Sequence, residues 1–224
     1  MSEGIMTPKE NPLSTFDADA IAWLETRMWQ AYYAKQDARL FLLLVRLVAQ
    51  QFGLPWARAV RVALMLVRPA MHFARTRAEY EAAIPDIAAA YTQLQEECGA
   101  SFDANEVAAR EVRWWVVHRH RAEMGAAALT DAIADLYAAI YRLPPSVVRE
   151  AARLHAEAAF VSDDGRDQYG VRGAPYWQEV SDLLQQSYRA LKAAVQSPVA
   201  GGLGLVSSWL ETSKGKGEKL RPRP

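Results

Sequence analysis

Apolar residues recur along most of this chain at three- and four-residue spacing, which predicts helices, whereas the alternating pattern of strands is nearly absent. A first helical stretch begins near Phe16, has a candidate break near Asp37 and ends at Gly53, a residue type that suits the position after a helix. Pro55 suits the first turn of the next helix, and Pro69 should kink or divide that helix. Glycine and proline thus punctuate a helical pattern.

The rest of the chain is punctuated in the same way. Pro85 begins a helix that Gly99 closes, and Asp103 with Glu106 forms a capping box for the next helix, which Gly125 follows. The further predicted elements are helices over 129–141 and 146–161, a loop over 162–175 that is dense in turn residues, and an amphipathic helix over 176–196.

Helices of these lengths, joined by short connections, predict an all-α fold: an antiparallel bundle of six to eight helices. We expect a flexible N-terminus over residues 1–13 and one helical domain over 14–197. Residues 198–224 change abruptly to glycine, serine and lysine, which predicts a disordered tail.

Composition narrows the function classes. The 224 residues are 51% hydrophobic, which is enough for a sizeable core, and 26 basic residues balance 26 acidic ones, which argues against a nucleic-acid partner. The single cysteine, Cys98, excludes an intramolecular disulfide and a cysteine-rich zinc site, and it fits a cytoplasmic protein. The first residues lack the apolar stretch of a secretion signal, and no apolar run reaches the roughly 20 residues that span a bilayer.

Three ionisable residues fall on apolar helix faces. Glu111 and His118 are seven residues apart, so they lie within about 20° of each other around the helix. Glu25 has the same setting on the first helix, with Ile21 and Trp29 on its side. We predict that Glu25 and Glu111 are buried in one interior region. An unpaired buried carboxylate costs several kcal/mol, so each acid must be protonated, ion-paired or bound to metal.

A metal centre is one way to accommodate these acids. Glu25 and Glu111 would be oxygen ligands and His118 an imidazole ligand. Tyr32 and Trp115 would orient these ligands by hydrogen bonding without touching the metal. Carboxylate and imidazole ligands from facing helices are typical of non-haem iron and manganese, which are the expected cofactors. The weaker ligand candidates are His72, His155 and Glu157.

Two arrangements without a metal would also satisfy the acids. They could pair with buried arginines, or they could simply accept hydrogen bonds from Tyr32, Tyr33 or tryptophan indole groups. The candidate arginines form a stripe on the second helical stretch: Arg58, Arg61, Arg68 and Arg75.

The Glu-x6-His spacing of Glu111 and His118 resembles one ligand element of the haem-oxygenase-like di-iron oxidases. This resemblance implies an iron centre with oxidative chemistry, and it covers one helix. The second, histidine-rich ligand helix of that family has no counterpart among His72, His120 and His155. The Glu-x-x-His spacing of the paired-carboxylate iron bundles is also absent from the sequence. The favoured function is a metal-binding bundle for oxidative chemistry or iron handling, which as an enzyme would be a non-haem oxidoreductase.

A second pair of acidic residues indicates a different possible metal site. Asp131 and Asp135 resemble the paired acids that hold magnesium in isoprenoid synthases. Both acids lie opposite the apolar positions of their helix, however, and no second aspartate-rich motif accompanies them. We therefore expect both to lie on a solvated face.

The tail carries a short apolar patch, made up of Leu203, Leu205, Trp209 and Leu210. Its "GGLGL" start followed by a later leucine resembles the cargo-loading tails that direct proteins into encapsulin shells, although an extra Ser208 and Trp209 precede Leu210. The alternative function is therefore a non-enzymatic interaction or adaptor protein that docks through this tail, its buried glutamates paired with arginines. We expect the tail to be dispensable for folding and to matter for association.

Overall fold

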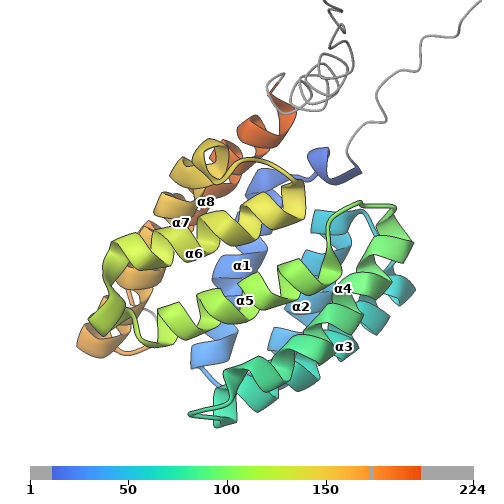
Figure 1. Cartoon of the computed structure of the whole chain (residues 1–224). Coiled ribbons are helices and arrows are strands. Elements are labelled where there is room, and N and C mark those ends of the chain that lie inside the picture. The colour runs from blue at the N-terminus through green and yellow to red at the C-terminus, as the bar shows by residue number, and fades with distance from the viewer. Residues whose placement is uncertain (1–11, 172–173, 198–224) are drawn as a thin grey trace, which may run out of the picture.

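A computed structural model describes residues 12–171 and 174–197. These residues form eight α-helices and two 3-10 helices, with no strand among them, and this confirms the predicted all-α bundle (Figure 1). The elements are η1 (Pro12–Ser14), α1 (Ala18–Tyr33), α2 (Asp37–Phe52), α3 (Trp56–Arg75), η2 (Tyr80–Ala83), α4 (Ile84–Cys98), α5 (Ala104–Arg119), α6 (Arg121–Tyr141), α7 (Pro145–Tyr169) and α8 (Tyr176–Gln196).

Several helix ends lie where the punctuation of the sequence predicts them. Gly53 and Gly99 close α2 and α4 in the left-handed conformation, with φ of 65° and 69°, which costs glycine little because it has no Cβ. Asp103 caps α5 by accepting hydrogen bonds from the backbone N–H groups of Asn105 and Glu106. Local hydrogen bonding is enough to place these ends.

One of the two outcomes predicted for Pro69, a divided helix, does not occur, and one helix boundary lies elsewhere than predicted. Helix α3 is not divided at Pro69, which is buried, and it continues to Arg75. Helix α5 ends before His120 rather than at Gly125, and α6 begins at Arg121. Gly125 nevertheless interrupts the helical backbone as predicted: with φ of 80°, a conformation that L side chains rarely adopt, it kinks α6.

The predicted loop over 162–175 is wrong in its first half, because α7 continues to Tyr169. Its turn-type residues serve packing and ion pairing instead. Asp163 is buried and pairs with Arg121 and Arg166. A Cβ on Gly165 would overlap the ring of Tyr176, so only glycine lets α7 approach that ring at the start of α8.

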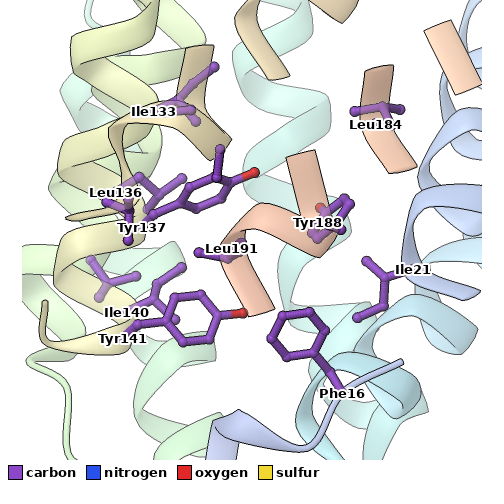
Figure 2. Packing of buried hydrophobic residues seen from close by; sticks show 14 of the residues in the cluster. Phe16, Ile21, Ile133, Leu136, Tyr137, Ile140, Tyr141, Leu184, Tyr188 and Leu191 are labelled. Carbon is purple, nitrogen blue, oxygen red and sulfur yellow. The ribbon is translucent and has the colours of Figure 1, made fainter. Parts of the chain in front are cut away.

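Consecutive helices pack against each other, and α1 also packs against α8, which brings the two ends of the described chain together. Figure 2 shows Phe16 and Ile21 on one side of α8 and Tyr137 on the other, with Leu191 between them. One continuous core from Leu13 to Val195 thus holds most of the bundle.

No single helix in the described residues is long and apolar enough to cross a membrane. Helices α2 and α3 meet the length and composition criteria only together, across a bend of 118°.

Candidate functional site

Glu25 enters the core from α1, next to the fully buried Ile21 and Ala22. Its side chain is 13% exposed, and its two carboxylate oxygens have different neighbours. The Tyr188 hydroxyl on α8 donates to Oε2 at 2.6 Å. Oε1 faces Nε2 of His155 on α7 at 3.5 Å. Glu25 therefore joins three helices at one point in the core.

The His155 ring is held from its other side. Its Nδ1 lies 2.7 Å from the Tyr137 hydroxyl on α6, and its ring packs edge-on against Trp29 and Trp114, with ring centres 5.6 and 6.0 Å away. Burial lowers the pKa of His155, although the negative charge of Glu25 acts in the opposite direction. The imidazole is therefore neutral near pH 7, which is the form that binds metal ions.

Glu111 lies on α5 and is held by neutral donors. The Tyr91 hydroxyl donates to Oε2 at 3.2 Å, and the Trp114 indole N–H donates to Oε1 at 3.4 Å. Burial raises the pKa of Glu111 to about 7, against the hydrogen bonds from Trp114, Tyr91 and Trp115, and the charge of Glu25 raises it further. Glu25 and Glu111 are thus both inside the bundle and close enough for one charge to act on the other.

His118 does not join these glutamates. Its Nε2 lies 3.0 Å from Oδ2 of Asp163, which is 2% exposed. The same carboxylate accepts from Arg121 at 2.6 Å, from Arg166 at 2.7 Å and from the Tyr33 hydroxyl at 3.1 Å. Burial acts to raise the pKa of Asp163, but the hydrogen bond from His118 and the surrounding positive charges outweigh it and lower the pKa. His118 therefore belongs to a separate ion-pair cluster.

The weaker ligand candidates have different surroundings. His72 is exposed on α3 beside Thr76, and Glu157 is exposed and pairs with Arg153. His155, by contrast, is the histidine that meets Glu25.

Of the two residues expected to orient the ligands, Trp115 lies near enough to Glu111 to lower the pKa of that carboxyl group, against the effect of burial. Tyr32 does not contact the glutamates: its side chain is 44% exposed, and its ring packs against Tyr33 and Lys35.

Arginine pairing, one of the two alternatives without a metal, is not found in the residues that the structure describes. Among them, no arginine lies within ion-pair distance of Glu25 or Glu111, because α3 buries its alanine and valine face and turns its arginines outward. Arg58, which is exposed, pairs instead with the partly buried Glu97 of α4 at 2.8 Å. Hydrogen bonding to tyrosine and tryptophan is the arrangement that matches, although the tyrosines are Tyr91 and Tyr188 rather than Tyr32 and Tyr33.

The aspartates of α6 are surface residues, as expected. Asp131 pairs with Arg149 at 2.5 Å, and Asp135 pairs with Arg113 at 2.6 Å. The apolar tail patch that was predicted to dock a partner, Leu203 to Leu210, lies outside the described residues.

The sequence pattern missed Asp163 because its turn-type neighbours predicted a loop there. A usable signal was present: Ala152, Ala156 and Ala159 precede Asp163 by 11, 7 and 4 residues, which places them on one helical face. Extending the helix pattern past residue 161 turns Asp163 inward with these buried alanines.

Two surface hollows lie away from Glu25, Glu111 and His155. One, of about 530 Å³, is lined by polar residues such as Arg110, Asp135 and Arg142. The other, of about 380 Å³, lies among α1, α2 and α3, with Trp23 and Trp56 in its lining. Within the part of the chain that the structure describes, no three His, Cys, Asp or Glu side chains converge closely enough to hold a metal ion as they stand.

Comparison of the chain with protein-family models, with curated proteins and with solved structures found no match.

Proposed function

We propose that this protein binds a divalent iron or manganese ion in the core of its bundle, for iron handling or oxidative chemistry. The proposed ligands are Glu25 and His155, with Glu111 as the third after its carboxylate turns from Tyr91. His155 takes the place that the sequence assigned to His118, because Asp163 already engages the His118 imidazole.

One observation carries the proposal: Glu25 Oε1 and His155 Nε2 face each other at 3.5 Å, while a tyrosine holds the opposite side of each group. Two donors about 2.1 Å from a common ion are about 3.0 Å apart in octahedral geometry and about 3.4 Å apart in tetrahedral geometry. The observed separation is close to this range, so a cation would draw the two atoms together by a small movement.

The tyrosines fit the role of outer partners. A metal-bound histidine normally donates its other ring N–H to a fixed acceptor, and the Tyr137 oxygen is placed to accept from Nδ1 of His155. Tyr188 orients the carboxylate of Glu25 in the same way. The donor set of two carboxylates and one imidazole matches the preferences of iron and manganese.

The charge balance also favours a cation. Glu111 lies in a site where burial raises its pKa to about 7, and the charge of Glu25 adds to that rise. When bound, the metal supplies the positive charge that holds both carboxylates ionised and, as iron or manganese, a redox-active centre. Neither surface hollow is lined by Glu25, Glu111 or His155, so no pocket for an organic substrate adjoins these residues among those described.

Titration of the purified full chain with Fe(II) under anaerobic conditions, or with Mn(II), tests the proposal, with metal analysis after gel filtration as a second readout. We expect about one equivalent of bound metal, lost in Glu25→Gln and in His155→Gln. Tyr188→Phe should weaken binding by roughly 10- to 100-fold, since it removes an outer partner.

Two histidine variants serve as matched controls. His118→Gln and His72→Gln should keep the metal, because neither side chain belongs to the proposed ligand set. Loss of metal in His118→Gln with retention in His155→Gln would restore the ligand set that the sequence pattern predicts. A folded wild-type chain that binds neither metal would refute the proposal.

A further inference from the structure

The outward face of α3 carries an apolar strip. Leu64 and Met71 are 58% and 47% exposed, and Trp56 at the start of the helix is exposed as well. Val60 and Val67, which are half-buried, fill the intervening turns of the same side. Exposed apolar side chains therefore run along most of the length of α3.

A row of arginines borders this strip. Arg61, Arg68 and Arg75 are seven residues apart and hence lie nearly above one another on the helix. The whole of α3 contains no aspartate or glutamate. Arg61 and Arg68 are 66% and 86% exposed, and their ion pairs are long, at 3.9 Å and 3.8 Å. The positive charge of this row is therefore only weakly compensated.

The apolar character continues onto the neighbouring helices. Trp56 shares the lining of one surface hollow with Trp23 of α1 and Arg46 of α2. Of the eight large hydrophobic side chains that are most exposed in the described residues, six lie on α1, α2 or α3, and the other two are Met124 and Tyr169. Figure 1 shows α3 at the edge of the bundle, with α2 and α4 beside it.

We propose that this face, defined by Trp56, Leu64, Met71, Arg61 and Arg68, binds the surface of an anionic membrane, with α3 lying in the headgroup region. An exposed apolar strip beside a basic row is the pattern of helices that lie at a lipid interface. Tryptophan favours the same region, and arginines near the surface are attracted to anionic headgroups. The strip runs along the outward side of a single helix, so one flat lipid surface can contact most of its length.

Co-sedimentation of the full chain with vesicles tests this proposal. One set of vesicles contains phosphatidylcholine with phosphatidylglycerol, and the other contains phosphatidylcholine alone. We expect binding to the anionic vesicles that weakens as salt increases, and little binding to the neutral ones. Leu64→Ser with Met71→Ser, and separately Arg61→Gln with Arg68→Gln, should each lower the binding by roughly tenfold or more.

Two control variants distinguish binding through this face from non-specific binding by exposed apolar or basic residues elsewhere on the protein. Met124→Ser with Tyr169→Ser removes exposed apolar groups elsewhere, and Arg113→Gln with Arg149→Gln removes two charges elsewhere. Both control variants should bind as the parent does. Circular dichroism checks the helix content of each variant. If the Leu64→Ser, Met71→Ser variant does not fold, the Arg61→Gln, Arg68→Gln variant alone tests whether this face binds the vesicles.

The proposal is wrong if the chain binds neither kind of vesicle, or binds both equally. It is also wrong if the control variants lose as much binding as the α3 variants, or if the arginine variant keeps full binding. Recovery of an acidic protein on this face, without vesicle binding, would assign the surface to a protein partner instead.

Discussion

At the scale of single residues, two buried acids of this bundle are stabilised in opposite ways. Glu111 has neutral donors around it, so burial raises its pKa to about 7. The Asp163 side chain is almost unexposed, yet its pKa falls, because His118, Arg121 and Arg166 surround it. Positive charge, rather than burial alone, decides the protonation state of a carboxylate in this core.

The raised pKa of Glu111 makes stability depend on pH. The unfolded carboxyl group loses its proton near pH 4.5, and the folded one near pH 7. Folding is therefore unaffected by this group below pH 4.5, and it loses about 3 kcal/mol as pH rises from there through 7. Glu111→Gln cannot ionise, so its free energy of unfolding relative to the parent should rise by roughly 2–3 kcal/mol between about pH 5 and pH 8.5.

Urea unfolding of chelator-treated protein across this pH range measures the difference. Asp19→Asn is the control: Arg189 lowers the pKa of the parent carboxyl group, and neither group changes its charge over this range, so the cost of that variant should stay the same from about pH 5 to pH 8.5. A constant difference for Glu111→Gln as well would show that Glu111 keeps an ordinary pKa.

At the scale of helices, the crossing of α7 and α8 depends on one missing side chain. Alanine normally stabilises a helix relative to glycine by roughly 0.5–1 kcal/mol. At Gly165, however, the added Cβ would lie within 2.7 Å of three ring atoms of Tyr176, which is itself buried. The ring cannot move aside freely, because its hydroxyl also donates to the Gly170 carbonyl at 3.0 Å.

We therefore expect Gly165→Ala to destabilise the protein by about 1–3 kcal/mol, as overpacked cores do. Thermal and urea unfolding measure the change. Gln168→Ala, an exposed substitution one turn further along α7, should be close to neutral. In a Tyr176→Leu background the cost of Gly165→Ala should shrink, and an unchanged cost would mean that the ring is not the obstacle.

At the scale of the whole molecule, the first and last described helices close the bundle. Arg189 on α8 pairs with Asp19 on α1 at 2.7 Å, and the Gln196 side chain donates to the Ser14 carbonyl at 2.9 Å. The buried residues of the described chain run from Leu13 to Val195. The core that the structure describes therefore spans the bundle from its first described helix to its last.

A chain that stops after Ser197 should consequently keep its helix content and melt within about 2 °C of the full chain, because it loses no residue of this core. Far-UV circular dichroism and a thermal scan check both. A melting temperature lower by many degrees would show that residues 198–224 contribute to the fold.

The sequence by itself determined the features that depend on local interactions, namely where several helices begin and end and which residues face inward. Gly53, Gly99 and Asp103 end or begin helices through their own backbone conformation or a hydrogen bond to a near neighbour, so their positions are readable from the chain. Helical periodicity likewise turned Glu25 and Glu111 inward. Each of these inferences needs only residues within one or two turns.

Only the tertiary structure decided which partners those inward side chains meet. Glu25 accepts from Tyr188, 163 positions away, and His118 pairs with Asp163, 45 positions away. Periodicity predicts which side of a helix faces the core. It does not predict how far distant helices are rotated or shifted relative to one another, and this decides which side chains meet. The continuation of α7 past residue 161 follows from the same cause, because buried ion pairs and the packing of Gly165 outweigh a local composition that favours a turn.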